Sequence, residues 1–317
     1  MVSVADIDAM HDKIGPYIKN TPLENFAALD SAVGNGIKVF VKPEILQPTK
    51  SFKVRNAFAA IISLPESQKH KGIIAASTGN LGQALALAGS ILKVPVTICV
   101  KHNNNPRKNE AIRKYGAELI EYGNNYDEAY SLAMQLSDER GIPYIRSSEN
   151  VGAFSGAATV GWEIFNDKEQ LDRVVLAVGS GAHAAGAGLV AHHLSPQTKV
   201  VGIQAANSCT IHDHWLKMES ITPETETIAD AISMGPNHFS SSVELLTGNL
   251  DEFITATEED ILNAIRLIYK TTNYIVEPAG AIGLAGVIAN RHIWQNERIA
   301  VVFSGGNLND NLRYILD

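Results

Sequence analysis

Short apolar runs recur along the chain, and each is followed by a longer segment with the spacing of a helix. The runs are GIIAAS (72–77), VTICV (96–100), ELIEY (118–122), PYIRS (143–147), RVVLAVGS (173–180), KVVGIQA (199–205), EFITAT (252–257) and RIAVVFSGG (298–306). This alternation predicts strand–helix–strand units built around mostly parallel sheets. Continuous β-branched runs such as RIAVVF fit strands that are buried on both faces.

One helix start can be read directly from the sequence. Thr257 and Asp260 have the spacing of a capping box, and the residues that follow place Ile261, Ile265 and Ile268 on one apolar face. This helix is expected to be scaffold. By contrast, the polar stretches 222–227 and 235–242 predict a long loop.

Composition excludes several classes of function. The chain has 317 residues, 45% of them hydrophobic, and a net charge of -8, so no basic surface for nucleic acid is expected. Cys99 and Cys209 lack CxxC spacing, which argues against a disulfide framework and for a reducing, cytoplasmic location. The longest near-apolar run, 279–289, is much shorter than the roughly 20 residues of a membrane helix, so no membrane contact is expected.

A glycine-rich turn follows the predicted strand at 173–178. Gly179, Ser180, Gly181, Ala182 and His183 precede a helix of small residues, and such a turn directs backbone N–H groups at a bound phosphate. A dinucleotide site and a purely structural tight turn are the alternatives. A dinucleotide site requires an acidic residue at the end of the next strand, where this chain has Gln204 instead.

Two further turns of this kind follow predicted strands. Ser77–Asn80 lies between a strand and a helix, and Ser304–Asn307 follows the last apolar run. Ser, Gly and Asn are also the ordinary residues of caps and turns, so each turn taken alone has a structural explanation. Together with the polar stretch LQPTKSFKVRNAF (46–58), they indicate a ligand site at the carboxyl ends of parallel strands. The stretch itself does not distinguish Lys50 from Lys53 as a reactive amine.

The motifs LQPTKSFKVRNA, ASTGNLGQALA, VGSGAHAAG, VEPAGAIGLA and FSGGN, in this order, carry a family resemblance. From about residue 10 to about residue 310, the chain resembles the fold-type II pyridoxal phosphate enzymes, most closely the serine/threonine dehydratase and serine racemase group. The resemblance implies two open twisted α/β domains of the tryptophan synthase β-subunit-like architecture. It implies a large cofactor-binding domain of residues 1–71 and 148–317 and a small domain of residues 72–147.

The resemblance also implies the roles of individual residues. Lys53 and Thr78 are implied as catalytic residues; Phe52, Lys53, Asn80, Gly179, Ser180, Gly181, Ala182, His183, Glu277 and Ser304 as contacts of pyridoxal 5'-phosphate; and Ser77, Thr78, Gly79, Asn80 and Gln83 as contacts of the substrate. Lys53 would form the Schiff base, and burial beside a cation such as Arg55 would lower its pKa. Ser304 would face the pyridine nitrogen with a neutral hydroxyl, which favours elimination or replacement at Cβ.

The expected activity is that of an ammonia-lyase (dehydratase) that converts a serine- or threonine-like β-hydroxy amino acid to a 2-oxo acid and ammonia. The alternatives are an amino acid racemase, in which Thr78 would return a proton, a β-replacement synthase similar to threonine synthase, and a non-catalytic relative that binds the cofactor. A homodimer acting on a small amino acid is expected. The side chain of that substrate is not indicated by the sequence.

Several positions depart from the family pattern. Lys50 stands where the family usually has glycine, so the turn before Ser51 must have regular dihedral angles or be strained. No metal is expected. Gln204 replaces the glutamate that holds a hard cation in racemase-like members, with no carboxylate until Asp213. His212 and His214 are expected on opposite sides of a strand, without an acidic or cysteine companion at ligand spacing.

Overall fold

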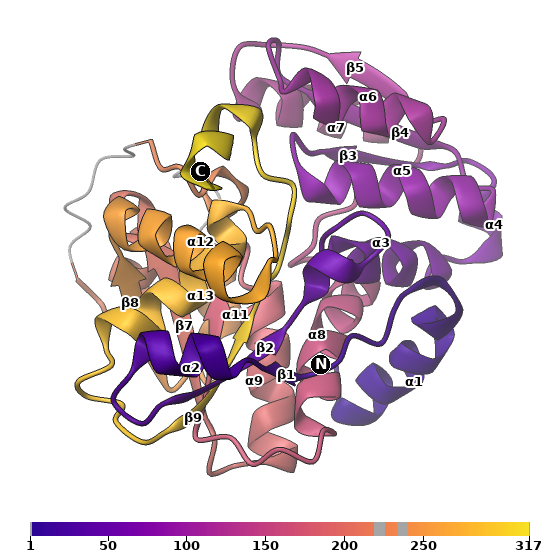
Figure 1. Cartoon of the computed structure of the whole chain (residues 1–317). Coiled ribbons are helices and arrows are strands. Elements are labelled where there is room, and N and C mark those ends of the chain that lie inside the picture. The colour runs from indigo at the N-terminus through magenta and orange to yellow at the C-terminus, as the bar shows by residue number, and fades with distance from the viewer. Residues whose placement is uncertain (1, 219–225, 234–239, 317) are drawn as a thin grey trace.

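The computed structural model describes residues 2–218, 226–233 and 240–316, which form two sheets covered by helices (Figure 1). The six-stranded sheet has the order β1-β2-β9-β6-β7-β8, with β1 at Glu24–Asn25, β2 at Lys38–Lys42, β6 at Arg173–Ala177, β7 at Lys199–Ala205, β8 at Glu252–Ala256 and β9 at Arg298–Val302. The three-stranded sheet has the order β3-β4-β5, with β3 at Ile73–Ala76, β4 at Val96–Val100 and β5 at Glu118–Glu121.

The described helices connect these strands and cover them. They are α1 (Val4–Ile14), α2 (Ala27–Val33), α3 (Lys53–Ile62), α4 (Glu66–Lys69), α5 (Asn80–Leu92), α6 (Pro106–Lys114), α7 (Tyr126–Arg140), α8 (Val151–Phe165), α9 (Ala182–Leu194), α10 (Thr210–Trp215), α11 (Ser240–Leu246), α12 (Glu258–Thr272) and α13 (Pro278–Ala289). Short 3-10 helices are η1 (Gly15–Tyr17), η2 (Glu44–Leu46), η3 (Ala206–Ser208), η4 (Asp230–Ile232) and η5 (Asp310–Leu316). Within the described ranges, no helix has the length and apolar character needed to cross a membrane.

The strands pair in parallel throughout, except that β1 is antiparallel to β2. The predicted parallel sheets are therefore confirmed, and every predicted strand except PYIRS forms. In that run, Tyr144 makes only an isolated bridge with Ile74. Pro143 has no N–H group to donate to a ladder, which limits the pairing of this segment. The sequence reading also missed β1 and β2.

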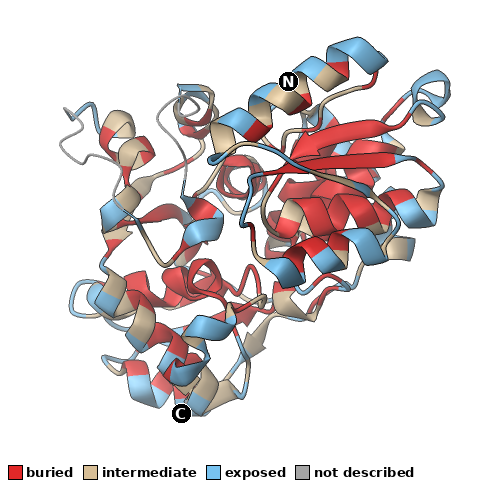
Figure 2. Ribbon diagram, turned by 90° about the horizontal axis from the view of Figure 1, so that it is seen from above, coloured by how far each residue is buried: buried red, intermediate tan, exposed pale blue. Residues whose placement is uncertain are grey.

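Buried residues make up most of the central strands and the helix faces that cover them (Figure 2). Alternate residues of β2, β6 and β9 enter different cores. Val175 packs into the core that includes α2, α12 and α13, whereas its neighbours Val174 and Leu176 pack into the core that includes α8 and α9. Successive strand side chains point to opposite faces, so helices on both sides bury both sets. The carboxyl ends of β3, β6 and β9 lead into the three polar turns predicted from the sequence.

Helix α3 lies between the two sheets. It packs against α8 on one side and α5 on the other, and its residues Val54, Phe58 and Ile61 belong to the same core as β3 and β4. The core beside the three-stranded sheet therefore includes residues from outside 72–147. The division into domains of 1–71 with 148–317 and of 72–147 stays a prediction.

The predicted capping box forms at the start of α12. Asp260 N donates to Thr257 Oγ1 at 3.2 Å, and Thr257 N donates to Asp260 Oδ2 at 3.1 Å. Ile261, Ile265 and Ile268 are all fully buried, as predicted. The predicted polar loop falls mainly on 219–225 and 234–239, outside the described residues, and its last residues, 240–242, begin α11 instead.

The strand expected around His212 and His214 is wrong. Both residues lie on α10, and His212 N donates to Gln204 Oε1 at 2.9 Å, which anchors the helix to the end of β7. The expectation that His212 lacks a companion is also wrong. Cys209, His212 and Asp213 each place a ligand atom within 4.8 Å of the others, because residues three and four positions apart share one face of a helix.

Candidate active site

Lys53 is the first residue of α3, and the chain just before it is tied to the turn after β9. Ser51 forms a bridge with Gly305, and Phe52 N donates to Ser304 O at 3.1 Å. Gly306 N donates to Lys50 O at 2.8 Å. Two motifs that are far apart in the sequence are thereby held side by side, and Lys53 begins α3 beside the turn that follows β9.

Lys50 adopts the left-handed conformation, with a φ of 54°. The turn before Ser51 is therefore strained, and the alternative of regular dihedral angles is wrong. The left-handed region brings Cβ close to the following carbonyl, which costs a non-glycine residue about 1–2 kcal/mol. The Lys50 side chain is exposed, whereas Lys53 is half-buried.

Replacing Lys50 by glycine is expected to raise the free energy of unfolding by about 1 kcal/mol, because glycine takes a positive φ without strain. Urea denaturation measures the change. Lys71→Gly is the matched control, since Lys71 is exposed but is not among the residues with positive φ, and it is expected to lower the free energy of unfolding. Equal destabilisation by both changes would contradict a strained Lys50.

Burial lowers the pKa of Lys53 to about 8, and the negative charge of Glu277 acts in the opposite direction. The Lys53 Nζ atom lies 4.6 Å from the centroid of the Phe52 ring. Burial is confirmed as the cause, but Arg55, which pairs with Glu44 and Glu163, does not contribute to the shift of this pKa. Burial therefore makes Lys53 a better nucleophile at neutral pH than an exposed lysine.

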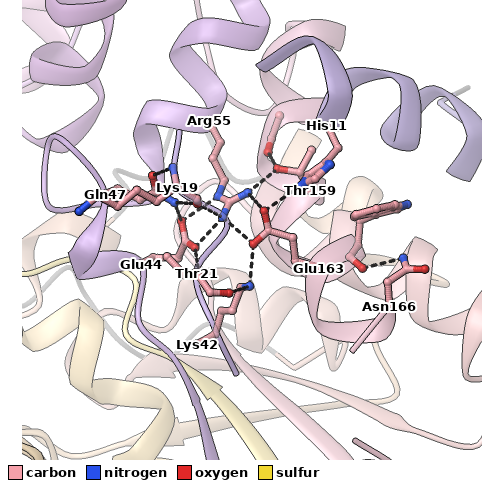
Figure 3. Close-up of polar contacts among 12 residues, drawn as sticks. His11, Lys19, Thr21, Lys42, Glu44, Gln47, Arg55, Thr159, Glu163 and Asn166 are labelled. Carbon is pink, nitrogen blue, oxygen red and sulfur yellow. Dashed lines mark hydrogen bonds and ion pairs between the residues drawn. The ribbon is translucent and has the colours of Figure 1, made fainter. Parts of the chain in front are cut away.

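Arg55 is fully buried and lies at the centre of a network of ion pairs (Figure 3). Its Nη2 lies 2.8 Å from Glu44 Oε1, and its Nη1 lies 2.7 Å from Glu163 Oε1. Lys42 Nζ lies 2.6 Å from Glu163 Oε2, and His11 Nε2 lies 3.0 Å from Glu163 Oε1. The network joins η2, α3, α8 and β2, and so fixes the first turn of α3 that carries Lys53.

Burial opposes the charged form of Glu163, but the hydrogen bond with His11 and the charges of Arg55 and Lys42 lower its pKa to about 2. The two carboxylates Glu44 and Glu163 balance the two cations Arg55 and Lys42. Removing one of these four side chains would leave a buried charge without its partner, which is strongly destabilising. The sequence alone does not indicate this network, since Glu163 lies 108 positions from Arg55 in the chain.

The glycine-rich turn at 179–183 lies between β6 and α9. Gly181 has a φ of 82° and caps α9. In the part of the chain that the structure describes, no backbone carbonyl is recorded as accepting from the amides of Gly179, Ser180 or Gly181. A side chain at Gly179 would place Cβ 3.3 Å from the Ile232 backbone, so the turn is closely covered by η4. Unpaired amides at a helix start suit an anion.

His183 is the second residue of α9, and only 4% of it is exposed. Its ring stacks on Phe52, with centroids 4.6 Å apart, and neither ring nitrogen has a hydrogen-bond partner among the described residues. Burial and the charges of Lys53 and Arg55 lower the pKa of His183 to about 3, so its ring is neutral. A buried imidazole without partners points to a missing polar group beside it.

Three side chains form a hydrogen-bonded chain beside Lys53. Asn80 Nδ2 donates to Glu277 Oε1 at 2.6 Å, and Asn307 Nδ2 donates to Asn80 Oδ1 at 2.7 Å. Burial raises the pKa of Glu277 to about 7. A Cβ at Gly305 would lie 2.0 Å from Glu277 Oε1, so a side chain there would displace the Glu277 carboxylate from its present position. Asn307 was not among the predicted site residues, although it lies in the predicted turn.

Ser304 is buried in the turn after β9, and its Oγ donates to Ala279 O at 3.2 Å. Across the site, Ser77 Oγ accepts from Gly82 N at 3.0 Å and so holds the start of α5. Gly79 is the N-cap of that helix, Thr78 precedes it, and Gln83 is buried in its first turn. The predicted substrate residues are therefore gathered at one helix start, where backbone donors favour a carboxylate.

Helix α6 contacts the opposite side of the site. Lys108 Nζ lies 3.4 Å from Asp230 Oδ2 on η4, and Arg107 Nη1 lies 2.7 Å from Asp310 Oδ1 on η5. Asn105 Nδ2 donates to Asn309 Oδ1 at 2.9 Å. The positive charge of Lys108 also lowers the pKa of Glu277, against the larger effect of burial. These contacts, which the sequence did not indicate, join the helix after β4 to segments beside the six-stranded sheet.

Comparison with known proteins places this geometry in a family. A family model described as pyridoxal-phosphate dependent enzyme matches residues 14–305. The L-threonine ammonia-lyase of Thermotoga maritima is 30% identical over 314 residues, which cover 98% of this chain and 77% of that protein. The biosynthetic L-threonine dehydratase of Pasteurella multocida is 31% identical over 313 residues, but this chain spans only 60% of its length.

A solved structure of serine racemase from Dictyostelium discoideum superposes with a TM-score of 0.87 at 28% identity, covering 97% of this chain and 99% of that one. The architecture implied by the sequence motifs is thus confirmed. With its Lys53, its glycine-rich turn and the match over residues 14–305, the chain belongs to the family of pyridoxal-phosphate dependent enzymes, in the fold-type II architecture.

Proposed function

We propose that this protein is a pyridoxal phosphate-dependent ammonia-lyase, which converts a serine- or threonine-like β-hydroxy amino acid to a 2-oxo acid and ammonia. The observation that carries the proposal is the attachment of the Lys53 segment to the Ser304–Gly305 turn through Phe52 N and Ser304 O, 3.1 Å apart. It brings an amine of lowered pKa to the edge where the polar turns meet. The names of the two similar dehydratases support the substrate class.

The residues present fit the cofactor. The buried ring nitrogens of His183 lack partners among the described residues. Within the same residues, no backbone carbonyl accepts from the amides of the adjacent turn, which suits a phosphate. Gly305 has no side chain, which lets Glu277 and Asn80 lie directly against the turn after β9. Gly179–His183 would hold the phosphate, Ser304 would face the ring nitrogen, and Asn80 would bind the ring hydroxyl.

When bound, the cofactor supplies an electron sink that makes the hydrogen on the substrate Cα acidic. Lys53 would hold the cofactor through its Nζ and then accept the α proton on the same atom. Ser77–Gly79 and Gln83 would bind the substrate carboxylate at the start of α5, which fixes the Cα–H bond relative to Lys53. Ser304 carries no charge, which favours loss of the β-hydroxyl over transamination.

We also propose that the protein acts as a homodimer in the cytoplasm, on a small amino acid and without nucleic acid. The net charge of -8 supports the absence of a nucleic-acid partner. The two buried cysteines, Cys99 and Cys209, form no disulfide within the described residues, which supports a reducing compartment.

Incubating the purified protein with pyridoxal phosphate and L-threonine or L-serine is expected to release ammonia and a 2-oxo acid in equal amounts. Ammonia is measured by a coupled enzyme assay, the 2-oxo acid by hydrazone formation, and the remaining amino acid by chiral chromatography. Formation of the D-enantiomer without ammonia would indicate a racemase instead. A product that forms only when a thiol or amine nucleophile is added would indicate a β-replacement synthase.

A further inference from the structure

Three metal-ligand side chains lie together on α10, away from the residues assigned to the cofactor. Cys209 is the N-cap of this helix, and His212 and Asp213 follow three and four positions later on the same face. Cys209 Sγ lies 3.6 Å from Asp213 Oδ1, and His212 Nδ1 lies 2.9 Å from the same oxygen. All three ligand atoms lie within 4.8 Å of one another.

These distances suit a small tetrahedral metal ion. A zinc ion binds sulfur at about 2.3 Å and nitrogen or oxygen at about 2.0–2.2 Å, so its ligand atoms are separated by roughly 3–4 Å. In the structure, the Asp213 carboxylate accepts hydrogen bonds from the Cys209 thiol and the His212 imidazole. A metal ion would displace the thiol proton of Cys209 to solvent, and His212 would bind the ion through Nδ1 with its own proton on Nε2. The resulting set of one thiolate, one carboxylate and one neutral imidazole would offset the charge of a divalent ion.

The surroundings hold the three side chains in place. Cys209 and Asp213 are buried. The His212 ring packs edge-on against Phe253 of β8, with centroids 5.3 Å apart, and its backbone amide is bound by Gln204. A thiolate and an imidazole favour Zn²⁺ and similar transition metals over Mg²⁺ or Ca²⁺, which prefer oxygen ligands. The site therefore differs in kind from the hard-cation site that Gln204 makes unfavourable.

Helix α10 is connected to the glycine-rich turn through α11. The two helices pack together, and α11 in turn packs against α9. Ser242 Oγ of α11 donates to Ser180 O at 3.1 Å, and Leu246 lies against Gly181. Because α10 has only six residues, its helical form depends on such tertiary contacts. A metal ion bound to one face of α10 would stabilise that helix, and with it the contact of α11 with the glycine-rich turn.

We propose that Cys209, His212 and Asp213 form a binding site for a zinc-like transition metal ion that stabilises α10 and, through its contact with α11, the glycine-rich turn. The described residues supply three ligands, and water would complete a tetrahedral set. The site does not depend on the proposed reaction, since metal binding can be measured without substrate or cofactor.

Adding Co²⁺ to the purified full chain, after removal of metals by a chelator under reducing conditions, is expected to give about one bound ion per chain. Absorption bands of a tetrahedral cobalt site and a thiolate-to-cobalt charge-transfer band are expected, and Zn²⁺, but not excess Mg²⁺, should abolish them. Zn²⁺ is also expected to raise the melting temperature in proportion to the logarithm of its concentration above the dissociation constant. Absence of the charge-transfer band after Co²⁺ is added would overturn the proposal.

The variant Cys209→Ser is expected to lose the charge-transfer band and to bind Zn²⁺ at least about 100-fold more weakly. Cys99→Ser is the matched control, because Cys99 is the other buried cysteine and lies on β4, where the described residues form no such ligand group. This variant is expected to bind Zn²⁺ as the unaltered protein does. Circular dichroism verifies the fold of both variants. Equal Zn²⁺ affinity in a folded Cys209→Ser variant would refute the site.

A second measurement needs no variant. Zn²⁺ is expected to slow the alkylation of Cys209 in the unaltered protein, as followed by peptide mass spectrometry, because a metal-bound thiolate is withheld from the reagent. Cys99 is the internal reference, since burial raises its pKa to about 11. An unchanged rate at Cys209 in saturating Zn²⁺ would contradict the proposal.

Discussion

Replacing Lys53 by alanine is expected to lower the rate of ammonia release by at least about 10³-fold, because the variant lacks both the covalent attachment and the base that accepts the α proton. Steady-state assays measure the loss. The variant should fold normally, since Lys53 is only half-buried and its backbone amide still donates to Ser51 Oγ at 3.2 Å. Borohydride reduction followed by peptide mapping should locate the cofactor on Lys53 in the unaltered protein and nowhere in the variant.

Lys50→Gly serves as the control, because Lys50 is the neighbouring lysine, lies in the same stretch and is exposed. It should retain the reduced adduct on Lys53. Finding the adduct on Lys50, or full activity in Lys53→Ala, would show that the wrong lysine has been assigned.

The pH dependence of cofactor attachment gives a further check on Lys53. Because burial lowers its pKa to about 8, the neutral, nucleophilic amine should increase as pH rises through about 8 instead of about 10.5. The rate of adduct formation, followed by visible absorbance in the cofactor-free protein, should rise with the same midpoint. A midpoint near that of free lysine would mean that the amine is not desolvated.

Replacing Arg55 by methionine is expected to lower the free energy of unfolding by about 3–5 kcal/mol, which is the effect of breaking a buried ion pair by removing one partner. Glu44 and Glu163 would stay buried without the guanidinium that now lies 2.8 Å and 2.7 Å from them. Urea denaturation and thermal melting measure the loss. The first turn of α3 should loosen as well, so cofactor affinity is expected to fall with stability.

Arg140→Met is the matched control for this change. Arg140 Nη1 also lies 2.7 Å from a carboxylate, Glu118 Oε2, but both side chains are partly exposed, so the loss is expected to be about 1 kcal/mol or less. Adding Glu44→Gln to Arg55→Met should recover part of the stability, because it removes one uncompensated charge. Losses of equal size from Arg55→Met and Arg140→Met would contradict the importance of burial.

Local sequence patterns predicted those parts of the fold that depend on neighbouring residues. The β-branched run of β9 and the capping box of α12 each carry their signal within a few positions, and both form as expected. His212 was misplaced because a short polar segment has no clear period, and its helical form is set by contact with Gln204. Pro143 is the opposite case, where one residue without an N–H group limits an apolar run to an isolated bridge.

The site shows the same division. The motifs that carry Lys53, Asn80 and Ser304 could be recognised, and the structure brings all three to one edge. The pairing of Arg55 with Glu44 and Glu163 could not be found, because the second glutamate lies 108 positions away and a buried glutamate has no local signature. The same holds for Lys108, whose position beside Asp230 depends on how α6 lies against η4.

The place of β9 in the six-stranded sheet has a consequence for the order of folding. This strand comes after all the others in the chain, yet it lies between β2 and β6. During synthesis, the edges of β2 and β6 that face β9 therefore stay unpaired until β9 is made. Unpaired strand edges are prone to aggregation. Ser304 and Gly305 follow β9 directly. Closure of the sheet and completion of the cofactor site are thus a single late event, and the cofactor can stabilise only a chain that has already inserted its central strand.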